Sequence, residues 1–240
     1  MLNSLNRKKS SSILLLLVCL ISCGKKEQPA EIAENHAVAP PYLKVDTFDI
    51  LSPKKLDLTV QYNKENYGIN SYKLDTPRII VVHYTAIDNL DATLNLFKND
   101  NIASSRDYIK DFSSLNVGIH YVVNKDGRIF HLMPDTIVAR HLIGFNHVSL
   151  GIENISKDST DLTDAQVESD ARLIEFLAKK YPTIQYMIAH HEYNDTTLPH
   201  YKYFRSLNAA YKPYGKIDPG PNFMLKLRKR LAADGVVLEK

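Results

Sequence analysis

Polar side chains of the kind that bind and activate a metal ion occur at the ends of short apolar segments. His83 and His190 each end one such run, and Glu153 closes a third. Asp218 lies in a turn just after Lys216. Two histidines and one carboxylate can hold a zinc ion with an open position for water, and a further carboxylate can serve as the base. The sequence therefore predicts a metal-dependent hydrolase.

Short buried strands are expected to position these groups. Residues 79–82, 149–155 and 184–189 are predicted strands, and the first is a continuous apolar run typical of a strand buried on both faces. A strand that ends at a cleft places its last side chain there, so two such ends can share one ion with Asp218. Taken alone, a histidine at either place is more often a hydrogen-bonded structural residue. The prediction therefore depends on the combination.

Helices and one hairpin complete the predicted fold. The Asp-Gly pair at residues 126–127 lies between two apolar runs and predicts a hairpin. A helix over residues 163–181 begins with a capping box, and Pro221 can open a C-terminal helix. A shorter helix is expected around residues 90–97, where leucines and a phenylalanine recur at helical spacing. Strands that alternate with helices predict an α/β fold with a mixed central β-sheet flanked by helices.

The ligand set contains one ambiguity that spacing does not resolve. His191 directly follows His190 and is a competing ligand. Neighbouring residues on a strand point to opposite faces of the sheet, so only one of the two can face the ion.

Glu153 and Lys216 are candidates for catalysis. A carboxylate inside an apolar strand is costly unless it is paired or functional, so Glu153 can be a base beside the metal or a salt-bridge residue. Lys216 precedes Asp218 by two residues, and in an extended segment both side chains share one face. A lysine placed there can stabilise an oxyanion, and the alternative is a solvated surface lysine.

The first residues resemble an export signal. Basic residues 7–9 precede a short apolar segment that ends at Ser22-Cys23, which resembles a bacterial lipobox. We therefore expect residues 1–22 to be a lipoprotein signal peptide, with lipid on Cys23; an ordinary signal peptide with a coincidental cysteine is the alternative. Residues 23–45 are polar and predict a flexible tether, which leaves residues 46–240 as the catalytic domain. Gly24 after the cysteine favours the outer membrane, facing the periplasm.

Composition limits the partners and the ligands. Loss of residues 1–22 leaves 27 of the 30 basic residues against 27 acidic ones, which gives no basis for binding nucleic acid. Of the two cysteines, Cys19 lies in the segment expected to be removed and Cys23 is expected to carry lipid, so neither is available to ligate the metal. We expect a monomer that meets the membrane through its lipid anchor.

Five ordered motifs make the resemblance to a known family plain. The chain resembles the type 2 N-acetylmuramoyl-L-alanine amidases over roughly residues 79–223, most of the domain. The motifs are VHYTA at 82–86, GIHY at 118–121, NHVSLGIE at 146–153, AHHE at 189–192 and KIDPGPNF at 216–223. Position by position, the resemblance implies that His83, His190 and Asp218 bind one zinc ion. It also implies that Glu153 is the catalytic glutamate and Lys216 the catalytic lysine.

The resemblance also bears on the remaining positions. It favours His190 over His191 as the second ligand. His141 occupies the place of a histidine that helps to form the substrate groove, although residues 142–144 depart from the family's continuation, and Asn146 is assigned to substrate binding with it. Residues 192–215 form a tyrosine-rich insertion where the family has a short loop. A lid that faces the substrate and a surface excursion whose tyrosines simply pack are equally good interpretations.

The function implied by the resemblance is hydrolysis of the amide between N-acetylmuramic acid and L-alanine, in peptidoglycan or in muropeptides. The zinc site would lie at the edge of a substrate groove. Two other functions are considered. The same fold serves in non-catalytic peptidoglycan-binding modules, but those typically lack a zinc ligand. The second alternative is a zinc hydrolase of another amide, whose substrate groove the insertion has reshaped.

Overall fold

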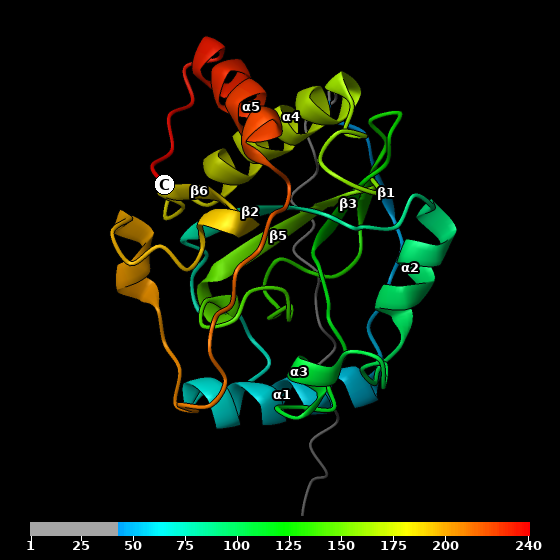
Figure 1. Cartoon of the computed structure of the whole chain (residues 1–240), viewed down its shortest axis with the longest axis vertical. Coiled ribbons are helices and arrows are strands. Elements are labelled where there is room, and N and C mark those ends of the chain that lie inside the picture. The colour runs from blue at the N-terminus through cyan, green and yellow to red at the C-terminus, as the bar shows by residue number, and fades with distance from the viewer. Residues whose placement is uncertain (1–42) are drawn as a thin grey trace, which may run out of the picture. The chain divides into compact units, whose positions relative to one another are not determined.

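A six-stranded mixed β-sheet forms the centre of the computed structural model, which describes residues 43–240 (Figure 1). The strand order is β1-β4-β3-β5-β2-β6. The strands are β1 (Val45–Thr47), β2 (Ile79–Tyr84), β3 (Tyr121–Val123), β4 (Ile129–His131), β5 (Ser149–Asn154) and β6 (Tyr186–Ala189). The mixed sheet confirms the predicted fold class.

Most neighbouring strands are parallel. β2 pairs in parallel with both β5 and β6, and β3 pairs in parallel with β5. The predicted hairpin is present as the antiparallel pair β3–β4, which turns through Gly127 at φ 84°. Because β2, β5 and β6 run in the same direction, their carboxyl ends meet at one edge of the sheet, which is where α/β proteins place ligands.

Helices cover both faces of the sheet, as predicted. The helices are α1 (Pro53–Tyr67), α2 (Leu90–Lys98), α3 (Asp107–Lys110), α4 (Asp164–Lys180) and α5 (Pro221–Ala233). Single 3₁₀ turns span Asn146–Val148, His190–Glu192 and Pro199–Tyr203. The predicted capping box at the start of α4 is confirmed, and α5 begins at Pro221. Helix α1, whose N-cap is Ser52, was not predicted.

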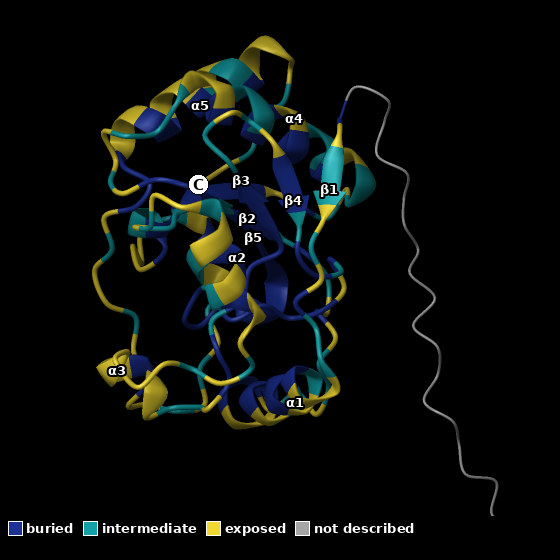
Figure 2. Ribbon diagram, turned by 90° about the vertical axis from the view of Figure 1, so that its right-hand side faces the viewer, coloured by how far each residue is buried: buried dark blue, intermediate teal, exposed yellow. Residues whose placement is uncertain are grey.

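The core divides along β2. Ile80 and Val82 pack toward α4 and α5, which lie side by side on one face. Ile79 and Val81 point the other way and pack with Tyr62 of α1. The central strands are accordingly buried, whereas the helices carry exposed outer faces (Figure 2). The sheet that carries the site is thus held rigidly on both sides.

Packed residues begin slightly before the predicted boundary at residue 46. Leu43 is buried in the core and β1 starts at Val45. The predicted signal peptide, Cys23 and the rest of the predicted tether lie outside the described residues. Within residues 43–240, no helix has the length and apolar character needed to cross a bilayer.

Candidate metal centre

His83 and Glu153 lie side by side at the carboxyl edge of the sheet. His83 is on β2 and Glu153 on β5, and the two are paired in parallel register. Paired residues on adjacent strands point to the same face, which here is the face of Val81. The Asn154 side-chain amide donates to the His83 carbonyl, at 3.3 Å, and also to Asp170 of α4. The rigid sheet therefore sets where both side chains enter the site.

His190 and Asp218 reach the same place from outside the sheet. His190 directly follows β6 and is the first residue of a 3₁₀ turn. Asp218 lies in the segment before α5, and its backbone carbonyl accepts a hydrogen bond from the His191 amide at 3.0 Å. The His191 ring also contacts that carbonyl, through Nδ1 at 3.1 Å. The structure therefore directs His190, and not His191, toward His83.

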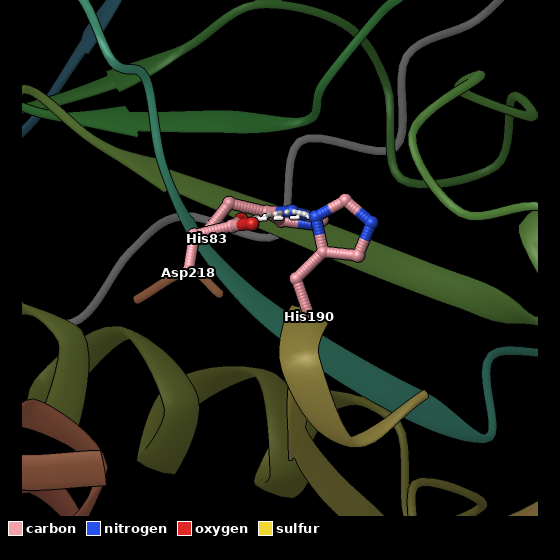
Figure 3. Close-up of side chains that lie close together, drawn as sticks. All are labelled: His83, His190 and Asp218. Carbon is pink, nitrogen blue, oxygen red and sulfur yellow. Dashed lines mark hydrogen bonds and ion pairs between the residues drawn. The ribbon is translucent and has the colours of Figure 1, made fainter. Parts of the chain in front are cut away.

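The side chains of His83, His190 and Asp218 converge on one point (Figure 3). His190 Nδ1 lies 2.8 Å from His83 Nδ1 and 2.9 Å from Asp218 Oδ2, and His83 Nδ1 lies 3.3 Å from that oxygen. A tetrahedral ion with bonds of about 2.0–2.2 Å would separate its ligand atoms by about 3.4 Å. The three atoms are therefore close to the arrangement that a metal ion requires, and this group can hold one.

The charge states of these groups also suit a cation. Burial and the neighbouring His83 lower the pKa of His190 to about 3, so its imidazole is neutral and free to coordinate. Burial would raise the pKa of Asp218, but hydrogen bonds with His190 and His83 outweigh it and hold the pKa well below its usual value. Two imidazoles and one carboxylate are a donor set that fits zinc.

His141 contacts His83 on the side of the ring opposite to His190 and Asp218. Its Nδ1 lies 3.0 Å from His83 Nε2, the ring nitrogen that faces away from the other two ligand atoms, and its Nε2 lies 3.2 Å from Ser149 Oγ. A β-carbon on Gly151 would lie 2.8 Å from His141 Nδ1, so only glycine leaves room for this ring. A hydrogen bond to the second nitrogen of a ligating histidine fixes its tautomer and orientation. His141 has this role in addition to its predicted contact with substrate, which stays a prediction.

Asn146 is fully buried and holds the chain around His141. Its Oδ1 accepts hydrogen bonds from the backbone amides of His141 and Leu142, at 2.9 and 2.6 Å. Its Nδ2 donates to the Tyr62 hydroxyl of α1 at 2.9 Å. These contacts give Asn146 a structural role, and its predicted contact with substrate stays a prediction.

Glu153 has the properties of a proton acceptor. Burial raises the pKa of its carboxyl to about 7, and the nearby Asp218 carboxylate acts in the same direction against the lowering effect of His83. Among the described residues, buried Oε2 of Glu153 has no hydrogen-bond partner. A buried carboxylate oxygen without a partner is costly, and such groups are typical of functional sites.

A pocket of about 530 Å³ opens over this group. Glu153 and Lys216 line it together with the three candidate ligands, so the structure brings together all five residues predicted for metal binding and catalysis. Its volume falls in the range typical of small-ligand sites. The arrangement can bind a cation, accept a proton and stabilise a negative charge within one cleft.

The tyrosine-rich insertion both packs and lines this pocket. Tyr193 and Tyr211 are buried, and Tyr211 stacks on Phe112 with ring centroids 4.5 Å apart. Tyr214 is half-exposed and lines the pocket beside Lys216. The packing expected of these tyrosines is therefore confirmed for Tyr193 and Tyr211, whereas the lid that faces the substrate stays a prediction.

Arg140 is a pocket residue that the sequence did not reveal. Its buried guanidinium contacts the rings of Tyr62 and Tyr211 and donates to three backbone carbonyls of residues 109–115. It thereby joins α3 to the insertion. A single arginine in a loop carries no sequence pattern that would have indicated this role.

Relatives of known type share this region. A family model described as N-acetylmuramoyl-L-alanine amidase (Amidase_2) matches residues 73–221. The endolysins of Escherichia phage T7 and Enterobacteria phage T3 are 30% and 29% identical to the chain over 101 residues. Each of these matches covers 40% of this chain and 66% of the phage protein, just under two thirds of its length.

Two solved amidase structures are also similar. The N-acetylmuramoyl-L-alanine amidase LysC from Clostridium intestinale URNW is 21% identical, with 81% of this chain and 99% of that chain covered and a TM-score of 0.49. The amidase AmiD from E. coli is 22% identical, with 67% and 58% covered and a TM-score of 0.45. The family model, in contrast, spans more than half of the 240 residues. The chain therefore belongs to the N-acetylmuramoyl-L-alanine amidase family.

Proposed function

We propose that this protein is a zinc-dependent N-acetylmuramoyl-L-alanine amidase. It hydrolyses the amide between the lactyl group of N-acetylmuramic acid and the first L-alanine of the stem peptide, in peptidoglycan or in muropeptides. The observation that carries the proposal is the convergence of His83, His190 and Asp218 on one point, in a pocket that also contains Glu153 and Lys216. Membership of the amidase family supports the choice of substrate.

Zinc is the metal that this donor set favours. The three ligand atoms lie within 3.3 Å of one another at the pocket, and among the described residues no fourth His, Cys, Asp or Glu joins the group. An open fourth position distinguishes catalytic zinc sites from structural ones. When bound there, zinc supplies the Lewis acidity that amide hydrolysis requires.

The protein's own residues carry the proton and the charge. Glu153 accepts a proton from the attacking water at its unpartnered carboxylate oxygen, and its raised pKa near 7 suits a group that must then release that proton. The same carboxyl gives the proton to the leaving amine nitrogen of L-alanine. The Lys216 ammonium stabilises the negative charge that develops on the scissile carbonyl oxygen. His141 keeps the His83 ring in its orientation throughout.

Measuring metal content and product release together tests this function. Purified protein is analysed for bound zinc and incubated with sacculi, and the released products are identified by mass spectrometry. We expect one zinc per chain and free stem peptides that begin with L-alanine. Stoichiometric zinc with no release would indicate a binding module, and release of other products would indicate a hydrolase of another amide. Either result would contradict the proposal.

Membrane attachment through Cys23 is a second part of the proposal. The apolar segment that ends at Ser22-Cys23 supports a lipid on this cysteine, and Gly24 supports the outer membrane with the domain in the periplasm. Replacement of Cys23 by serine should release the protein from the membrane fraction or leave the signal peptide uncleaved. Unchanged fractionation and processing of the variant would rule out the anchor.

A further inference from the structure

The insertion ends in a side-chain pair at the edge of the pocket. Lys216 Nζ donates a hydrogen bond to the Tyr214 hydroxyl at 2.9 Å. The same nitrogen lies 4.3 Å from the centroid of the Tyr214 ring. Both residues line the pocket that contains Glu153 and Asp218. Tyr214 therefore contacts the Lys216 ammonium group, which stabilises the oxyanion in the proposed mechanism.

Tyr214 is itself fixed by a second tyrosine. The Tyr193 hydroxyl donates to the Tyr214 carbonyl at 2.9 Å and accepts from the Tyr214 amide at 2.8 Å. Tyr193 is completely buried, and its ring packs edge-on against His190 with centroids 5.2 Å apart. One phenol thus satisfies both backbone groups of Tyr214 and ties the end of the insertion to a candidate metal ligand.

A third tyrosine holds the insertion from α3. The Tyr108 hydroxyl accepts from the Lys212 amide at 2.8 Å and donates to the Lys212 carbonyl at 2.9 Å. Its ring meets that of Tyr214 edge-on, with centroids 5.3 Å apart. The chain on the amino-terminal side of Lys216 is therefore held at two separate points.

We propose that Tyr214 is a positioning residue for Lys216, and that Tyr193 sets the place of Tyr214. The inference rests on the proposed function, in which Lys216 acts on the oxyanion. A lysine side chain without a partner samples many rotamers. If it became ordered only in the transition state, the entropic cost of ordering it would raise the activation barrier. A hydrogen bond to a fixed phenol orders the ammonium before the substrate arrives, as electrostatic stabilisation requires.

Removal of the Tyr214 hydroxyl tests the proposal on the full chain. Tyr214→Phe keeps the ring and should lower kcat about tenfold, the value of one hydrogen bond to a charged group, with KM changed less than about twofold. Bound zinc should stay stoichiometric. Tyr203→Phe, a change in the same insertion but outside the pocket, is the matched control and should behave as wild type. Wild-type kcat in Tyr214→Phe would overturn the proposal.

A double-mutant cycle tests whether Tyr214 acts through Lys216. In a Lys216→Met background, Tyr214→Phe should cause no further loss of kcat, because the group that it positions is gone. Independent, multiplicative losses would show that the phenol acts by another route, and would overturn the proposal.

Two measurements without substrate separate this inference from the proposed function. Tyr193→Phe should speed hydrogen exchange of the Tyr214 amide, which loses its acceptor. In protein with ¹³C-labelled lysine, relaxation of the Lys216 ε-carbon, assigned with Lys216→Arg, should show greater side-chain mobility in Tyr214→Phe than in Tyr203→Phe. Unchanged mobility would overturn the positioning role even in a protein with full amidase activity. Increased mobility in a protein without such activity would support the contact and contradict the proposed function alone.

Discussion

Replacement of Glu153 by glutamine separates its proposed catalytic role from a structural one. The amide has nearly the same size as the carboxylate but cannot accept a proton. If Glu153 is the general base, hydrolysis should fall by about 10²–10⁴-fold while zinc still binds, since Glu153 is not among the three ligands. The measurement is kcat with sacculi, together with zinc content.

The same substitution should stabilise the metal-free protein at high pH. The folded protein holds the Glu153 proton more tightly than the unfolded chain, because burial raises the pKa from 4.5 to about 7. The carboxyl therefore costs no stability below about pH 4.5, and its cost grows as the pH rises to about 7. At about 1.4 kcal/mol per pKa unit, this cost reaches at most about 3.5 kcal/mol. Glutamine removes it.

Urea denaturation of the chelated protein at two pH values measures this effect. At pH 8.5 Glu153→Gln should be more stable than wild type by up to about 3.5 kcal/mol, and at pH 4 the two should be equal. Asp170→Asn is the matched control: burial also raises the pKa of this fully buried carboxyl to about 7, although Asn154 donates to it. It should gain stability likewise but keep its activity. Wild-type activity in Glu153→Gln would refute the assignment of the base.

Four further substitutions test the other parts of the site. Lys216→Met should keep zinc but lower kcat by about 10²–10³-fold, with a smaller change in KM, because the charge acts mainly on the oxyanion; an equal loss confined to KM would contradict this. His83→Ala and Asp218→Ala should lose zinc and activity together, and stoichiometric zinc in either would show that the ligand set is wrong. Gly151→Ala should destabilise the protein by about 1–3 kcal/mol in urea, since its β-carbon would lie 2.3 Å from Ile119 Cδ1 and 2.8 Å from His141 Nδ1. An unchanged midpoint would mean that both side chains move aside freely.

Strands β2 to β6 and the longest helix could be predicted because local pattern determines them, whereas β1 was not predicted. β2 begins with four consecutive β-branched residues, and the capping box of α4 lies in four consecutive positions. α1 was missed because its buried face includes polar residues such as Thr59, Asn63 and Asn66. Their side chains bond to backbone carbonyls, so no apolar period marks the helix. Its end signals, Ser52 before Pro53 and Gly68 in the left-handed conformation, were available.

The three candidate ligand residues could be predicted from the sequence, but their surroundings could not. His83, His190 and Asp218 stand at recognisable places along the chain. Their partners depend on strand pairing: His141 reaches His83 only because Gly151 on the adjacent strand has no side chain. Nothing in the local sequence specifies that register, which arises when the sheet assembles.

The way the insertion is closed explains how a metal site tolerates it. Lengthening a flexible loop destabilises a protein little, since each doubling of the loop length costs only about 0.6 kcal/mol. An insertion is therefore harmful mainly when it displaces the residues at its two ends. Both ends are fixed here: the Tyr193 hydroxyl bonds to the Tyr214 backbone, and the His191 amide bonds to the Asp218 carbonyl. The distance between His190 and Asp218 is therefore set by contacts at the base of the insertion. Changes in its interior can reshape the wall of the pocket without moving the ligands, whereas changes at Tyr193 act on the metal centre directly.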